Sequence, residues 1–207
     1  VIGDSSGKST LLRNMIHRIS EGIPPSDAKL LVIDYRRQLL GECPATHLAG
    51  YASTKQDVQE FISQLVPLLE SRMPAGVDDP QTLRDRSWWK GPDIFLVVDD
   101  YDLVATSSGN PLQGLLELLP YGRDIGLHMV VARRCTGFSR TSFEPIMARL
   151  RELHPTIFLM SGTAEEGIIA GGRKARSLSK GRADVISNQG THQVVQFAHH
   201  VGEEKTE

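Results

Sequence analysis

The chain has little of several features that mark large classes of protein. Its 207 residues include two cysteines and 6% aromatic residues. Cys43 and Cys135 are far apart and lack the Cys/His spacing of a zinc site, so neither a disulfide framework nor a zinc finger is expected. No apolar run approaches the ~18 residues that a membrane-spanning helix needs, and no basic-then-apolar leader opens the sequence. These features favour a reducing, cytosolic compartment.

The chain also lacks an excess of charge of either sign. Lysine and arginine number 23 against 25 acidic residues, which gives a net charge of −2. A strongly basic balance usually accompanies nucleic-acid or anionic-membrane binding, so DNA is not expected as a partner unless a local patch binds it. With 40% hydrophobic and 23% charged residues, the composition is that of an ordinary globular fold. We expect one α/β domain over residues 1–207.

Short apolar runs alternate with amphipathic stretches along the chain. Runs of strand length occupy residues 29–34, 93–99, 128–132 and 156–160, and helical spacing appears over residues 9–19, 55–71 and 112–119. Uninterrupted apolar strands between helices predict a mostly parallel sheet with helices on both faces. Residues 183–187 and 193–198, separated by Asn-Gln-Gly-Thr, predict a terminal β-hairpin.

Two segments depart from this alternation. Residues 73–92 are rich in Pro, Gly, Asp and Arg and include Trp88 and Trp89, which predicts an insertion loop. The tryptophan pair either pins that loop to its own domain, the commoner case, or docks a partner. Val1, Ile2 and Gly3 resemble the end of a strand entering a glycine turn. We therefore expect the chain to be a piece of a longer polypeptide.

The strongest chemical signal is a glycine-rich run between a strand and a helix. The run consists of Gly3, Asp4, Ser5, Ser6, Gly7, Lys8, Ser9 and Thr10. Glycines let backbone N–H groups surround a phosphate, a lysine reaches the β and γ phosphates, and a hydroxyl, here that of Ser9, binds Mg²⁺. The run therefore predicts an ATP and Mg²⁺ site, whereas the alternative is a Gly/Ser turn that happens to precede a lysine.

The spacing of this run is unusual. Only three residues separate Gly3 from Gly7, where the common pattern GxxxxGK[S/T] has four. Either the loop is one residue tighter than usual, or a residue was dropped when the chain was numbered.

An apolar strand ending in two acids supplies the second signal. Asp99 is placed to hold Mg²⁺, partly through water, together with Ser9, and Asp100 takes the position where many ATPases carry a water-activating Glu. Because Asp is one methylene shorter, its carboxylate could fail to reach the attacking water. The alternative is that acids simply end strands at the polar edge of a sheet, as we expect for Asp34 and Asp102.

Four separated motifs, GDSSGKSTLLR, VVDDYDLV, GRDIGLHMVVARR and GRADVI, resemble the FtsK/SpoIIIE branch of hexameric P-loop ATPases. Among these, the chain is most similar to the C-terminal ATPase domain of the EccC family of type VII (ESX) secretion motors. The resemblance implies a RecA-like core, ATP binding and assembly with other ATPase domains of the motor, as a hexamer in the full protein. It also implies EsxA/EsxB-type export substrates and a cytoplasmic location at the inner face of the membrane, reached through segments outside this sequence.

The chain departs from active relatives after the strand at 128–132. Active relatives often carry a polar Thr-Gln or Ser-Gln pair that senses the γ-phosphate, whereas this chain has Arg133 and Arg134. With Asp100 and the tight loop, a sensor-like Arg133 predicts weak or absent hydrolysis; the alternative is a solvated basic pair. Two other functions remain open: an active double-stranded-DNA translocase, and a non-catalytic substrate-binding module in which ATP is a structural ligand.

Two weaker features remain. The leucines of residues 112–119 cover more than one helix face, so they either pack against the sheet or leave an apolar groove for an export signal. The basic segment 173–182 either binds a polyanion or forms a solvated loop near the nucleotide, and the lack of interleaved aromatics favours the loop.

Overall fold

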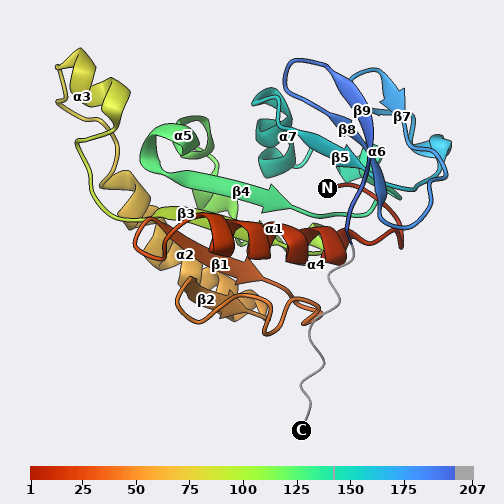
Figure 1. Cartoon of the computed structure of the whole chain (residues 1–207), viewed down its shortest axis with the longest axis horizontal. Helices are drawn as coiled ribbons and strands as arrows, with labels where there is room; N and C mark the ends of the chain where they lie inside the picture. Colours follow the sequence, from red (N-terminus) through yellow and green to blue (C-terminus); the bar gives the residue numbers. More distant parts are fainter. Residues whose placement is uncertain (142, 199–207) are drawn as a thin grey trace, which may run out of the picture.

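The computed structural model describes residues 1–141 and 143–198. A four-stranded sheet of order β2-β1-β3-β4 forms the centre, and a three-stranded sheet of order β5-β8-β9 lies beyond the end of β4 (Figure 1). The central strands are β1 (Ala28–Ile33), β2 (Leu48–Ala52), β3 (Asp93–Val98) and β4 (Leu127–Val131). All three of their pairings are parallel, which confirms the predicted sheet.

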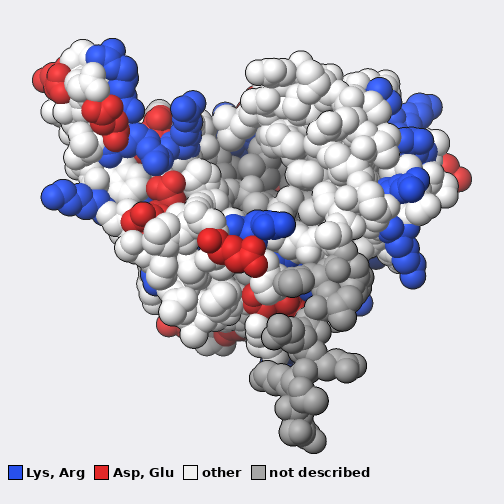
Figure 2. Space-filling view, viewed as in Figure 1, with Lys and Arg blue, Asp and Glu red and all other residues white. Residues whose placement is uncertain are grey.

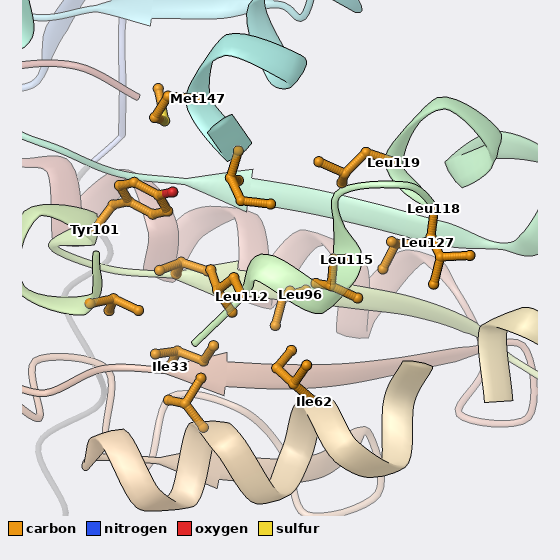
Figure 3. Packing of buried hydrophobic residues seen from close by; sticks show 14 of the residues in the cluster. Ile33, Ile62, Leu96, Tyr101, Leu112, Leu115, Leu118, Leu119, Leu127 and Met147 are labelled. Carbon is orange, nitrogen blue, oxygen red and sulfur yellow. The ribbon is translucent and has the colours of Figure 1, made fainter. Parts of the chain in front are cut away.

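Two long helices cover opposite faces of the central sheet. Helix α1 (Lys8–Gly22) packs Leu12 and Ile16 into a cluster that contains Val32 and Val97. Helix α2 (Lys55–Glu70) begins with a capping box between Thr54 and Asp57 and buries its apolar side against the other face. The two clusters use alternate residues of the same strands because successive side chains of a strand point to opposite faces. Figure 3 shows Ile62 of α2 facing Ile33 and Leu96 in the second cluster.

The α-helix predicted over residues 112–119 is wrong. Two 3₁₀ turns form here instead, η1 (Gln113–Leu115) and η2 (Leu119–Tyr121), with Pro111 just before the segment and Pro120 within η2. A 3₁₀ helix has three residues per turn, so it places every third residue on the same face. The buried members are Leu112, Leu115, Leu118 and Leu119. These leucines are part of the core (Figure 3), and they leave no exposed apolar groove on this segment.

The smaller sheet is antiparallel. It contains β5 (Ile157–Leu159), β8 (Arg182–Ile186) and β9 (His192–Gln196), so the predicted terminal hairpin is confirmed. The run at 156–160 was expected in the main sheet, but β5 pairs with β8 instead. Ile2 links the two sheets through parallel bridges to Arg133 and Leu159, beside an apolar cavity of about 310 Å³ between β4 and β5.

The segment 73–92 protrudes from the body, as an insertion should (Figure 1). It carries the short helix α3 (Pro80–Asp85), which buries none of its residues. At its base, Trp88 Nε1 donates to the Arg72 carbonyl (2.7 Å), and Trp89 Nε1 donates to the Asp124 carbonyl (2.9 Å). The Arg72 guanidinium lies 4.2 Å from the Trp89 ring centre. The tryptophan pair therefore pins the loop to its own domain.

The remaining elements are short. They are α4 (Tyr101–Val104), α5 (Gly122–Ile125), α6 (Phe138–Thr141), α7 (Pro145–Glu152), η3 (Ala164–Glu166), β6 (Ile168–Ala170) and β7 (Arg173–Lys174). Within the described residues, no helix has the length and apolar character needed to cross a membrane.

Candidate nucleotide-binding site

A polar cleft of about 330 Å³ opens at the carboxyl edge of the central sheet. It is lined by loop residues 4–10 and by Arg13, Arg36, Gln38, Asp100 and Arg134. The carboxyl ends of β1, β3 and β4 converge here because parallel strands all end at the same edge. The structure therefore brings together the glycine-rich loop and the acids that follow β3, as the sequence predicted.

The loop makes its turn with two residues in the left-handed region, Ser5 (φ 47°) and Gly7 (φ 99°). Gly3 is required for close packing, since a Cβ there would lie 2.5 Å from Ser6 Oγ and 2.7 Å from Met160 Cβ. Helix α1 begins directly after Gly7. Among the described residues, no hydrogen-bond acceptor is recorded for the amides of residues 5–10, so these donors are available to an anion at the helix N-terminus.

Lys8, Ser9 and Asp99 form the centre of the site. Lys8 Nζ donates to the Gly3 carbonyl (3.0 Å), and Ser9 Oγ donates to Asp99 Oδ2 (2.7 Å). The other carboxylate oxygen of Asp99 accepts from the Asp100 amide at 2.9 Å. Burial, with smaller contributions from Asp100 and Asp34, raises the pKa of Asp99. Two oxygens side by side, one of them a buried carboxylate, are the kind of ligands that Mg²⁺ prefers.

Asp100 is engaged by an arginine from another strand end. Its Oδ2 lies 3.2 Å from Arg36 Nη1, on the loop after β1. The Asp100 backbone is left-handed (φ 44°), a conformation that Asp tolerates better than most residues. The carboxylate predicted at the water-activating position is therefore paired with Arg36 in this structure.

Of the two arginines after β4, Arg134 lines the cleft and Arg133 does not, whereas the sequence predicted Arg133 there. Arg133 is 1% exposed, and its Nη2 donates to Asp102 Oδ1 (2.9 Å) and Thr141 Oγ1 (2.6 Å). Its guanidinium also lies 5.0 Å from the Phe138 ring. Arg134 instead lines the cleft, with its amide donating to Asp102 Oδ2. The sensor-like role predicted for Arg133 is not supported by its position, because Arg133 is a buried structural residue.

The loop is braced by two distant segments. The Asp4 carboxylate accepts from the amides of Cys135 and Thr136 and from Thr136 Oγ1 (3.0–3.3 Å). On the other side, the Gly181 amide donates to the Ser6 carbonyl (3.1 Å). Asp4 and Ser6 were predicted to bind nucleotide; the Asp4 side chain and the Ser6 carbonyl serve to hold the loop in place. The basic segment 173–182 thus lies beside the phosphate loop.

No family model matches the chain. Over 199 residues it is 46% identical to ESX-4 secretion system protein EccC4 of Mycobacterium tuberculosis, covering 96% of this chain and 16% of the relative. The chain belongs to the EccC family of type VII secretion ATPases. The solved cytoplasmic domain of Thermomonospora curvata EccC superposes with a TM-score of 0.92 at 40% identity, over 96% of this chain and 23% of that one. A structure of ATPases 2 and 3 of the same protein, in complex with a signal sequence peptide, matches equally well over 36% of its length.

Sequence reasoning on this EccC-family chain missed Arg36 and did not distinguish Arg134 from its neighbour. Arg36 follows β1 and Arg134 follows β4, so their positions at the carboxyl edge could have indicated the cleft. Of the four cations there, Arg13 is already committed to Glu42 (3.0 Å) and to the Gln38 carbonyl. Asp34 and Asp102 have structural partners, as expected; Asp34 accepts from the Leu39 amide and the Tyr51 hydroxyl.

A second pocket, of about 500 Å³, lies on the next face of α1. Leu11 and Asn14 form one wall, and Gln196 and Phe197 at the end of β9 form the other. Asn14 Nδ2 donates to the Ala198 carbonyl (2.8 Å), which joins the two walls. Since Thr10 lines the polar cleft and Leu11 lines this pocket, the two hollows adjoin along the helix.

Proposed function

We propose that this chain is an ATP-binding domain of a type VII secretion motor, with weak or absent hydrolysis, that helps recognise and export EsxA/EsxB-type proteins. The observation that carries ATP binding is the joint position of Lys8, Ser9 and Asp99 below a loop whose amides are available. The triphosphate would lie in the polar cleft, and the nucleoside would extend past Thr10 toward Leu11 and Phe197.

The cleft suits a magnesium-bound triphosphate in charge as well as shape. Lys8, Arg13, Arg36 and Arg134 line it and supply positive charge, although Arg13 and Arg36 also contact Glu42 and Asp100. Ser9 and Asp99 would hold Mg²⁺, partly through water. A divalent cation there would stabilise the charged form of Asp99, whose burial otherwise raises its pKa.

Weak hydrolysis is inferred from the length of the Asp100 side chain. Asp is one methylene shorter than the Glu that commonly activates water, and without nucleotide its carboxylate also pairs with Arg36. A base that is set back in this way is poorly placed to orient an attacking water.

The partner proposals rest on the relatives. A Thermomonospora curvata EccC structure contains a signal sequence peptide, which supports an export substrate as the partner class. DNA is the less favoured partner, because the chain has a net charge of −2. Basic side chains gather near β7 (Figure 2). Within the basic segment 173–182, Arg176 is paired with Asp184 at 2.8 Å. We further propose that the domain works with other ATPase domains of its motor, as a hexamer in the full protein, at the inner face of the membrane.

Replacing Lys8 by alanine tests nucleotide binding. Ligand at ~100 times its dissociation constant adds about 2.7 kcal/mol to the stability of the wild-type chain, which corresponds to roughly 5–10 °C in melting temperature. Lys8→Ala should abolish this ATP-dependent shift, whereas Lys90→Ala, at an exposed lysine outside the cleft, should retain it. An unchanged shift in Lys8→Ala would remove the lysine from the site.

Turnover of the wild-type chain within the ~1–100 s⁻¹ common for kinases would refute weak hydrolysis.

A binding titration tests the substrate class. A labelled C-terminal peptide of an EsxB-type protein and a DNA duplex are each titrated into the chain at low and physiological salt. We expect binding of the peptide, with DNA binding weak and lost as salt rises. Tight binding to DNA with none to the peptide would favour the DNA-translocase alternative. Peptide binding that is unchanged by Lys8→Ala and by ATP would favour the non-catalytic binding module.

A further inference from the structure

Arg36 lines the cleft, but the proposed function does not say how it responds to a bound nucleotide. It stands at the wall of the cleft, on the loop after β1, and its side chain is 62% exposed. Its recorded partner is Asp100, through a single Nη1–Oδ2 contact of 3.2 Å. Asp100 directly follows Asp99, which contacts Ser9, so Arg36 stands at the end of the cleft where Mg²⁺ and the last phosphate would lie.

We propose that Arg36 is a latch that distinguishes nucleoside triphosphates from diphosphates. Without nucleotide it is held by Asp100; a terminal γ-phosphate draws the guanidinium off the carboxylate and onto the phosphate oxygens. This inference rests on the proposed ATP site. It assigns to Arg36 a role in specificity and to Asp100 the role of its resting partner.

The electrostatics of the pair favour such an exchange. The guanidinium of Arg36 is 62% exposed although the Asp100 side chain is 14% exposed, so water competes for the arginine, and ion pairs screened in this way contribute about 1 kcal/mol or less. A phosphate offers an arginine two charged acceptors in the geometry of its planar fork, and such charge-assisted hydrogen bonds are the stronger kind. A diphosphate, held by the loop amides and Lys8, ends before the Asp100 side of the cleft and leaves the latch closed.

Arg134 provides an internal comparison. It faces the cleft from the β4 side, and its side chain is 59% exposed. Its recorded carboxylate contact is with Asp102, at 4.0 Å, and Asp102 already accepts from Arg133 and from the Arg134 amide. Arg134 can therefore attract phosphate without releasing Asp100. Only the effect of Arg36 should depend on Asp100.

Calorimetric titration with MgATP and with MgADP tests the latch, in the wild-type chain and in Arg36→Ala. We expect Arg36→Ala to weaken ATP binding roughly tenfold or more and ADP binding by less than about twofold. Arg37→Ala, at the exposed neighbour outside the cleft, serves as the matched control and should change neither. Equal losses for ATP and ADP, or no loss, would overturn the proposal. If the wild-type chain binds no ATP, the proposed function fails instead.

Asp100→Asn decides whether Arg36 moves. If ATP releases the latch, Asp100→Asn should strengthen ATP binding more when Arg36 is present than in the Arg36→Ala background. If Arg36 stays on Asp100, the carboxylate is screened in the wild type, and the gain in ATP affinity from Asp100→Asn should be larger in the Arg36→Ala background. A larger gain in the Arg36→Ala background would overturn the latch. With Arg134→Ala as background, the gain from Asp100→Asn should equal that in the wild type. Melting curves without nucleotide verify that each variant is folded.

Discussion

The chain contains one aspartate–arginine pair in its interior after β4 and another at the polar cleft, and the two pairs differ mainly in the exposure of the arginine. In the interior pair, Arg133 Nη2 lies 2.9 Å from Asp102 Oδ1 and the arginine is 1% exposed. In the cleft pair, Arg36 Nη1 lies 3.2 Å from Asp100 Oδ2 and the arginine is 62% exposed. The acids are two residues apart in sequence. Similar contact geometry thus serves structure in one region and leaves an arginine available for ligand in the other.

A third pair lies between these extremes. Asp184 on β8 is 2% exposed, but its partner Arg176 is 53% exposed. Arg176 donates two hydrogen bonds to the carboxylate, at 2.8 and 2.9 Å, and His192 of β9 contacts it at 2.9 Å. If the burial of the arginine governs the contribution of each pair, the loss of stability on removing the acid should fall in the order Asp102, Asp184, Asp100.

The largest effect is expected for Asp102→Asn. Removing this charge leaves the Arg133 guanidinium buried without a counterion, and breaking a buried pair in this way typically costs 3–5 kcal/mol. The free energy of unfolding in urea should fall by about 3 kcal/mol, with a melting temperature roughly 6–12 °C lower. Glu152→Gln removes the acid of an exposed pair with Arg149 and should change stability by less than about 0.5 kcal/mol. A loss below about 1 kcal/mol for Asp102→Asn would show that burial does not govern the order.

An intermediate effect, dependent on pH, is expected for Asp184. The hydrogen bonds from Arg176, and to a lesser extent the contact with His192, lower the pKa of Asp184 to about 2 from an ordinary value of 3.8. A depressed pKa means that this stabilisation is present above about pH 4 and is lost as the pH falls toward 2. The contribution is about 2 kcal/mol at most. Unfolding free energies of wild type and Asp184→Asn should therefore differ most at neutral pH and converge near pH 2.

The control for this prediction is Asp78→Asn, at an exposed acid in the protruding loop. It should leave the pH dependence of stability unchanged. A difference between wild type and Asp184→Asn that stays constant from pH 6 to pH 2 would contradict the assignment of the depressed pKa to this carboxylate.

Much of the fold followed from local sequence signals. Strands β1, β3 and β4 and the glycine-rich loop are encoded by continuous runs, so their presence in a parallel sheet could be predicted, whereas β2 was missed. Residues 112–119 could not, because leucines at spacings of three and four fit an α-helix as well as a 3₁₀ turn. Strand β5 was predicted as part of the parallel sheet, because an apolar run indicates a strand but not the strand with which it pairs.

The candidate site was predictable where one segment carries the chemistry and less so where the fold assembles it. Lys8, Ser9 and Asp99 follow from motifs. Arg133 and Arg134 do not, because consecutive side chains of an extended chain point to opposite sides, and the sequence does not tell which one faces the cleft. Arg36 lies 64 residues from Asp100, so only the parallel pairing of β1 with β3 brings the two together.

The smallest effect is expected for the open pair. Arg36→Ala and Asp100→Asn should each change the free energy of unfolding by less than about 1 kcal/mol, since the exposed guanidinium of Arg36 leaves the pair screened by water and salt. Asparagine is the appropriate substitution because it tolerates the left-handed backbone at position 100. A double-mutant cycle should give a coupling of roughly 0.2–1 kcal/mol that shrinks between 0.05 and 1 M salt, as is typical of exposed pairs. A coupling above about 2 kcal/mol that salt does not reduce would make Asp100–Arg36 as structural as Asp102–Arg133, and a pair held that firmly could not serve as a latch.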